Sequence, residues 1–183
     1  FFKAYPNDDR KEWNYMTEWK IKSGEIIPYT ESADKLPAIS KYYDYDEGAP
    51  GKSAQSNGIT CIYRYAEVLL MYAEASTRAT NSVNQDALNA IQEVQKRAGY
   101  QNRQIELTTT TEPTAFLAAV FNERGWEFFA EMKRWFELVR LEKVKEVRAE
   151  EWDASTFNTN HHYYFPVPYQ QVDLAGWTNN AGY

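Results

Sequence analysis

The chain has 183 residues, of which 43% are hydrophobic and 25% are charged. This length is enough for one domain with a hydrophobic core. Its net charge of −6 argues against nucleic-acid binding, which needs a basic surface, and against docking on anionic lipid. No apolar run approaches the length of a membrane span. Because Phe1–Pro6 lacks the pattern of a signal peptide, we expect either a cytosolic start or a piece of a longer chain.

Residues 1–60 lack a sustained helical period and are interrupted by Pro and Gly, which break helices and mark turns. We predict a loop-rich segment that carries many aromatic rings. The alternation over Trp19–Lys22 indicates a short strand, which turns at Ser23–Gly24.

The first predicted helix begins near residue 62 and belongs to a helical core that spans residues 61–150. Its charged positions recur every three or four residues, so they share one stripe, and most of its remaining surface is apolar. Such a helix is expected to pack on more than one side. The stripe comprises Arg64, Glu67, Met71, Glu74 and Arg78.

A second helix is predicted to start near Ser82 or Asn84, since Ser82 and Gln85 have the spacing of a capping box. Gly99 is the expected C-terminal cap, because it tolerates a positive φ. Two helices joined by a short turn form a hairpin like those stacked in tetratricopeptide arrays. The predicted inner face consists of Ala87, Ile91, Val94 and Ala98.

A third helix is predicted to begin at Glu112-Pro113, where proline suits the first turn. Its inner face includes Phe116 and Val120, and another helical stretch runs over Trp135–Leu141. The pattern leaves open whether these are two helices or one kinked helix. Residues 151–183 are expected to form an extended tail, since their Pro content disfavours helix and central strand.

One carboxylate pair raises the possibility of catalysis. Glu123 and Glu127 lie one helical turn apart, and retaining glycosidases hold two carboxyl groups about 5 Å apart. Because Arg124 and Arg134 lie nearby, ion pairing is the interpretation we prefer. The same interpretation applies to Glu67 and Glu74 in the first helix.

Metal and cofactor chemistry finds little support in the sequence. His161 and His162 are adjacent, so in an extended segment they point to opposite faces and share a metal ion with difficulty. Ser53 follows a Gly-Lys pair but lacks the spacing of a phosphate loop. We therefore predict no metal, no cofactor and no nucleophile. Cys61 is expected to be a small buried core residue.

The aromatic residues of the first segment are the remaining candidate site. Sugar rings stack on Trp and Tyr, while neighbouring polar side chains bind their hydroxyl groups. The alternative is that these rings only pack the loops against the helices. The candidate sugar-stacking residues are Trp13, Tyr15, Trp19, Tyr42 and Tyr45.

Several stretches, in order, resemble the SusD/RagB family. Arg64–Ala75 is similar to the signature helix of that family, and Ala90–Gly99 and Asn122–Arg140 are similar to two later stretches. Phe165–Pro168 and Asn179–Tyr183 resemble its closing motifs. The sequence departs from the family where Met132 replaces a usual Gly.

The resemblance implies an all-α fold, an α–α superhelix of tetratricopeptide-like helix pairs with long irregular loop segments. The chain, residues 1–183, would be a single domain from the C-terminal part of a longer protein. It would comprise the loop-rich segment 1–60, the helical core 61–150 and the tail 151–183.

The family consists of surface-exposed outer-membrane lipoproteins that bind glycans, or in some cases peptides. They are not enzymes, they need no cofactor, and they lie as a lid on a TonB-dependent, SusC-like transporter. Membrane attachment would occur only through an N-terminal lipid anchor absent from this chain.

Two rival functions remain open at this stage. One is a tetratricopeptide-like scaffold that binds a protein or peptide, for which rings should line the concave helix face. The other is a glycoside hydrolase that uses Glu123 and Glu127, for which Gln substitutions should abolish turnover.

Overall fold

The structure is a computed structural model that describes residues 8–20, 23–42, 61–101, 105–147 and 163–183. The chain divides into two compact units, Phe1–Met132 and Lys133–Tyr183. These units follow from compactness, whereas the predicted boundaries at residues 60 and 150 follow from composition. Those two boundaries therefore stay a prediction.

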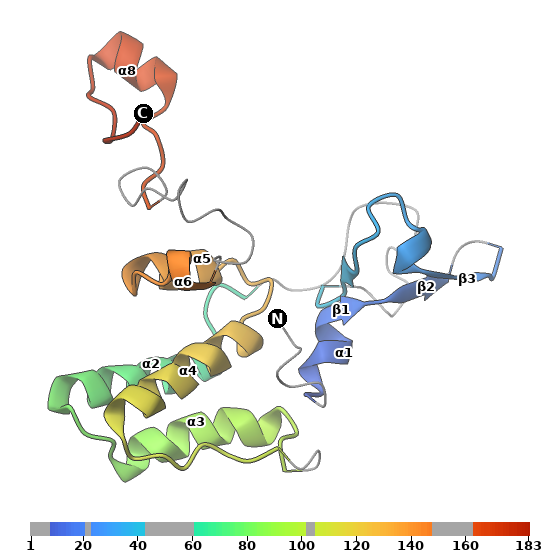
Figure 1. Cartoon of the computed structure of the whole chain (residues 1–183), viewed down its shortest axis with the longest axis vertical. Coiled ribbons are helices and arrows are strands. Elements are labelled where there is room, and N and C mark those ends of the chain that lie inside the picture. Colours follow the sequence, from blue (N-terminus) through green and yellow to red (C-terminus); the bar gives the residue numbers. More distant parts are fainter. Residues whose placement is uncertain (1–7, 21–22, 43–60, 102–104, 148–162) are drawn as a thin grey trace. The chain divides into compact units, whose positions relative to one another are not determined.

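Three helices that lie side by side form the body of the first unit (Figure 1). They are α2 (Tyr65–Thr80), α3 (Gln85–Arg97) and α4 (Pro113–Glu127). The helices α2 and α3 are joined by a short turn and pack on each other. The predicted hairpin is therefore confirmed.

The ends of α3 follow local rules, with one correction. Asn84 is the N-cap, and its side chain accepts a hydrogen bond of 2.7 Å from the Ala87 N–H. The Ser82 hydroxyl instead donates to Thr80 Oγ1, so a capping box from Ser82 was the wrong alternative. Gly99 follows the helix with φ +82°, as expected for a glycine past a helix end.

The helix α4 starts where the sequence predicts, with Pro113 in its first turn. The Glu112 carboxylate caps it by accepting hydrogen bonds from the backbone N–H groups of Thr114 and Ala115. A turn after Glu127 separates α4 from α5 (Arg134–Arg140). The sequence left this stretch open, and the structure has two helices.

That turn contains two non-glycine residues with positive φ, Ala130 at 61° and Met132 at 59°. Left-handed backbone favours Gly because a Cβ crowds the neighbouring carbonyl oxygen. Met132 is 90% exposed. A left-handed backbone turn therefore forms here without glycine.

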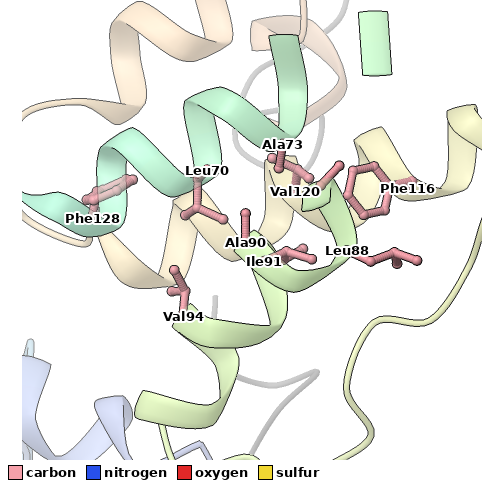
Figure 2. Packing of buried hydrophobic residues seen from close by; sticks show 10 residues of the cluster. Leu70, Ala73, Leu88, Ala90, Ile91, Val94, Phe116, Val120 and Phe128 are labelled. Atoms are coloured by element: carbon pink, nitrogen blue, oxygen red, sulfur yellow. The ribbon is translucent and has the colours of Figure 1, made fainter. Parts of the chain in front are cut away.

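The hydrophobic core of the first unit lies between α2, α3 and α4 (Figure 2). Leu70, Ile91 and Phe116 are fully buried in it. Burial of each such side chain stabilises the fold by roughly 1.5–3 kcal/mol. The cluster comprises Leu70, Ala73, Ala87, Leu88, Ala90, Ile91, Val94, Phe116, Val120 and Phe128.

The packing of α2 differs from the prediction. Its contacts are with α3 and α4 on one face, which includes the buried acids Glu67 and Glu74. Tyr65, Val68 and Tyr72 are between 43% and 66% exposed. The inner face of α2 therefore includes Glu67 and Glu74 of the charged stripe but not Met71 and Arg78, which are exposed, and within the described part of the chain this helix packs on one side.

The N-terminal segment of the first unit is short and irregular. The helix α1 (Arg10–Asn14) leads into β1 (Tyr15–Met16), which pairs antiparallel with β4 (Ala38–Ile39). The strands β2 (Glu18–Lys20) and β3 (Ile26–Pro28) form a second antiparallel pair, and a 3-10 turn, η2 (Tyr29–Glu31), follows. Gly24 lies between these strands with φ +90°, so the predicted turn is confirmed. The strand predicted over Trp19–Lys22 is confirmed for Trp19 and Lys20, while residues 21–22 lie outside the described residues.

The second unit contains α5, α6 (Val144–Val147) and α8 (Tyr169–Ala175). The helix α8 shows that the prediction of an extended tail over residues 151–183 was wrong for this stretch; α8 begins directly after Pro168, its N-cap. Asn179 Oδ1 accepts a 2.8 Å hydrogen bond from the Val167 N–H, and Asn180 Nδ2 donates to the Phe165 oxygen at 2.6 Å. The two closing motifs therefore bind each other.

No helix within the described ranges is both long and apolar enough to cross a membrane.

Candidate functional site

A pocket of about 580 Å³ lies in the first unit, between α1, the residues after β4, and the end of α4. Its lining combines aromatic rings with charged and polar side chains. The N-terminal segment supplies the two rings and the cations Arg10 and Lys41, and the helical body with its turns supplies the other charged residues. The lining residues are Arg10, Trp13, Asn14, Ser40, Lys41, Tyr42, Cys61, Arg64, Arg97, Glu127 and Glu131.

Two of the predicted sugar-stacking residues meet in this pocket. The Trp13 side chain is 68% exposed and the Tyr42 side chain is 37% exposed. The Tyr42 hydroxyl donates to the Ala130 carbonyl oxygen at 3.3 Å. Both rings thus offer apolar surface to solvent next to polar groups, as a ligand anchor requires.

The other three predicted residues are placed differently. Tyr15 is half-buried, with its ring centroid 6.4 Å from that of Phe129. Trp19 is half-buried on β2, opposite Ile27 of β3. Neither belongs to the pocket lining, and Tyr45 lies outside the described residues.

Cys61 corrects a further expectation. Its side chain is exposed and lines the pocket, whereas the sequence analysis placed it in the core. The residue precedes α2, in a stretch that has no helical period. An apolar neighbourhood in sequence therefore did not imply burial.

A row of acids runs along the C-terminal half of α4 and the turn after it, and its members Glu127 and Glu131 line the pocket. Glu123 and Glu127 are one helical turn apart, and Glu131 follows at the same interval. Their side chains are 0%, 1% and 5% exposed. Buried carboxylates need cationic partners, because unpaired charge in a protein interior is costly.

Arg10 is the principal partner of this row. Its Nη1 donates to Glu123 Oε1 at 2.7 Å and to Glu127 Oε2 at 3.0 Å. Its Nε and Nη2 bind both oxygens of Asp8, at 3.0 and 2.7 Å. Glu123 also accepts hydrogen bonds from the Tyr100 hydroxyl at 3.0 Å and from Gln95 Nε2 at 3.3 Å.

Three further cations complete the network around the remaining acids. Arg64 and Arg97 both donate to Glu127 Oε1, and Arg64 also binds both oxygens of Glu131, at 2.8 and 2.9 Å. Lys41 Nζ pairs with Glu131 at 2.5 Å and donates to the Glu127 carbonyl oxygen at 2.9 Å. The carboxylates of the described pocket are thus all paired.

The prediction of ion pairing is confirmed, while the partners expected from local spacing were wrong. Glu123 and Glu127 pair with distant arginines, not with their helix neighbours. Arg64 pairs with α4 and its turn, not with Glu67. Glu67 instead lies 4.0 Å from Arg124, and Glu74 pairs with Arg78 at 2.8 Å, as predicted.

Burial and pairing shift the pKa values of these groups in different directions. Burial raises the pKa of Glu123 above its ordinary value, against the effect of Arg10. Burial also acts to raise the pKa of Glu131, but hydrogen bonds from Arg64 and Lys41 outweigh it and lower that pKa. Burial lowers the pKa of Lys41.

Sequence reasoning missed the polar half of the pocket. Ser40 Oγ donates to the Trp13 carbonyl oxygen at 2.9 Å, and the Ser40 N–H donates to the Asn14 oxygen at 3.0 Å. The one available signal was the row of acids on α4, which indicates that cations must come from elsewhere. It does not indicate that Arg10 and Lys41 supply them.

Metal ligands do not converge within the described ranges, where no group of three or more His, Cys, Asp or Glu residues could hold an ion. His161 and His162 lie outside those ranges. The groups that line the pocket are aromatic rings, an amide, hydroxyl groups, the Cys61 thiol and paired charges.

This protein is α-helical and belongs to the α–α superhelix class. Its helices stack and include a tetratricopeptide-like hairpin, and an irregular aromatic segment beside them carries a pocket. The chain belongs to the SusD family, whose sequence model matches residues 4–183.

Two curated relatives come from Formosa agariphila. SusD-like protein P2 is 28% identical, over 99% of this chain and 39% of its own length. SusD-like protein P25 is 27% identical, over 76% of this chain and 26% of its own length. The chain thus spans about two fifths of the length of P2.

Solved structures agree with the fold assignment. A SusD superfamily protein from Parabacteroides distasonis has a TM-score of 0.74 and 26% identity, over 97% of this chain and 39% of its own. Surface glycan-binding protein A from Bacteroides uniformis has a TM-score of 0.64 and 28% identity, over 96% of this chain and 38% of its own.

Proposed function

We propose that this chain binds a glycan without transforming it, and that the pocket beside α1 takes part in binding. The observation that carries the proposal is the exposed Trp13 ring, which lines a pocket together with Tyr42. A sugar ring offers flat C–H faces, which gain most from contact with an exposed indole or phenol ring. The similarity to a surface glycan-binding protein adds support.

A buried donor beside the rings also supports the proposal. Asn14 lines the pocket and is 3% exposed, and its Nδ2 has no hydrogen-bond partner among the described residues. A buried amide donor without a partner costs about 1–3 kcal/mol. An oxygen-rich ligand is the class of molecule that would satisfy it after a small movement of the side chain.

We further propose that the chain is not a glycoside hydrolase. Glycosidases need one carboxyl group to act as an acid and the other to meet the sugar or a water molecule. Glu123 and Glu127 are instead buried and engaged by arginines. Changing either one to Gln should lower stability, and there should be no turnover to lose.

Family membership supports a cellular setting for this activity. We propose that the protein is an outer-membrane lipoprotein at the cell surface that delivers glycan to a TonB-dependent, SusC-like transporter. Co-purification with a transporter of that class from the native membrane would test the proposal. Recovery of the protein from the cytoplasm alone would refute it.

The test of glycan binding uses affinity electrophoresis of the full chain in gels that contain starch, xylan, laminarin, galactomannan or alginate. Calorimetry then follows with oligosaccharides of the polysaccharide that retards the chain most. We expect Trp13→Ala and Tyr42→Ala each to weaken binding about tenfold or more, as is usual for an aromatic side chain that a ligand covers.

The matched control is Trp177→Ala, since Trp177 is 58% exposed but lies in the second unit, outside the pocket lining. It should leave affinity unchanged. Equal affinities for wild type, Trp13→Ala and Trp177→Ala would place the binding surface elsewhere. No retardation in any gel would refute glycan binding within this panel.

A second candidate function, a scaffold for a peptide, rests on the outer face of α2. Tyr65, Val68 and Tyr72 are exposed there at helical spacing, which suits an amphipathic helix. Binding of an amphipathic helical peptide that is lost in Tyr72→Ala, with glycan binding intact, would favour this candidate for that face.

A further inference from the structure

We propose that Arg10 is a positioning residue for the pocket, because it holds Trp13 in place without meeting the ligand itself. The inference rests on the proposed function, since it assigns a role in the same site. Trp13 is 68% exposed, so burial does little to fix its ring. The backbone of α1 must fix it instead.

The helix α1 has only five residues, far below the length at which an isolated helix is stable in water. Its N-cap residue, Asp9, makes no capping hydrogen bond through its side chain. The Asp8 carboxylate takes that part, with Oδ1 accepting from the Arg10 N–H at 2.9 Å. Contacts outside the helix therefore decide whether α1 forms.

Arg10 supplies the contact that joins α1 to the helical body. One edge of its guanidinium binds both oxygens of Asp8, at 3.0 and 2.7 Å. Nη1 reaches Glu123 and Glu127 on α4, at 2.7 and 3.0 Å. The Arg10 side chain is 11% exposed and those of Asp8 and Glu123 are not exposed, so water weakens these bonds little.

The spacing along α1 connects this anchor to the ring. Trp13 is three residues after Arg10, which is nearly one helical turn. A second tie holds the far end of α1, since Ser40 Oγ donates to the Trp13 carbonyl oxygen at 2.9 Å. Lys41 and Tyr42 follow Ser40, and Lys41 Nζ pairs with Glu131 at 2.5 Å. Both pocket rings thus depend on the acids of α4 and its turn.

The planar fork of arginine is essential to this role. A guanidinium has five donors in fixed directions and can bridge acids on two sides. A lysine has the same charge but concentrates it at one ammonium group. It would balance the charge of Glu123 and Glu127 without also forming the two hydrogen bonds to Asp8. The substitution Arg10→Lys therefore keeps the positive charge beside α4 but removes the link that fixes α1 and Trp13.

The experiment uses the full chain with Arg10→Lys, Asp8→Asn and, as a matched control, Arg78→Lys. Arg78 pairs with Glu74 on α2 and is absent from the pocket lining. Hydrogen exchange followed by mass spectrometry reports on residues 8–16 and on the Ser40 amide, which donates to Asn14. Calorimetry uses oligosaccharides of the polysaccharide that most retards the wild type.

We expect faster exchange over residues 8–16 in Arg10→Lys and Asp8→Asn, with unchanged exchange in α2 and α3. We also expect affinity to fall about tenfold, as if the Trp13 contact were lost. The double variant Arg10→Lys/Trp13→Ala should bind no more weakly than Trp13→Ala, since both changes remove one contact. Arg78→Lys should match the wild type in both measurements.

Two outcomes would overturn the inference alone. One is wild-type affinity in Arg10→Lys although Trp13→Ala binds weakly, and the other is additive losses in the double variant. Wild-type affinity in Trp13→Ala, or no binding by the wild type, would instead refute the proposed site and this inference with it. Asp8→Asn decides the matter should Arg10→Lys fail to fold.

Discussion

The substitution Glu127→Gln gives the sharpest test of the network beneath the pocket. Glu127 is 1% exposed and accepts hydrogen bonds from Arg10, Arg64 and Arg97. Glutamine has the same shape but no charge, and its amide N–H groups would face guanidinium donors. Three cations would then share the remaining acids.

The expected cost follows from burial. Removing one member of a buried ion pair costs up to roughly 3–5 kcal/mol, and here Arg10 and Arg64 would keep only their remaining acids, Asp8, Glu123 and Glu131, as partners. Folded domains are stable by only about 5–15 kcal/mol, so the substitution would remove a large part of the free energy of unfolding. The melting temperature should fall by roughly 6–20 °C for a chain of this size.

Equilibrium urea unfolding, followed by circular dichroism at the helical band, measures this loss. The control is Glu146→Gln, which makes the same chemical change in an exposed pair: Glu146 is 69% exposed and pairs with Lys143 at 2.9 Å. That change should cost no more than about 1 kcal/mol. If Glu127→Gln cost as little as Glu146→Gln, the network would not support the fold.

Two further predictions concern the same unit. Gly99→Ala should destabilise the chain by more than about 1 kcal/mol, because Gly99 has φ +82° and an added Cβ would lie 2.4 Å from Asp9 Oδ2. The control Gly176→Ala, at φ +66° with nothing within 4 Å of the added Cβ, should cost less in the same urea titration. Equal costs would exclude the clash with Asp9. The lowered pKa of Glu131 means that the folded state holds fewer protons than the unfolded state, so its contribution to stability is present above the ordinary pKa and is lost as pH falls through the lowered one. Glu131→Gln should therefore flatten the fall of unfolding free energy below about pH 5, and an unchanged slope would contradict the assigned shift.

Local sequence determined the helical body of this protein. Asn84 and Glu112 cap their helices through side-chain hydrogen bonds to backbone N–H groups within three residues. Pro113 suits a first turn, and Gly99 suits the positive φ past a helix end. Such signals act over a few residues, so they can be read without knowledge of the fold. The resemblance to a family then supplied the arrangement of the helices.

Tertiary structure alone decided the site. Arg10 and Glu123 are 113 positions apart in the chain, and no local rule assigns one to the other. The sequence indicated that the acids of α4 would be paired, because arginines lie near them along the chain, but long-range packing chose other partners. The same packing exposed Trp13 beside Tyr42 and turned Tyr15 toward Phe129, since the surroundings of a ring depend on what the rest of the chain brings to it.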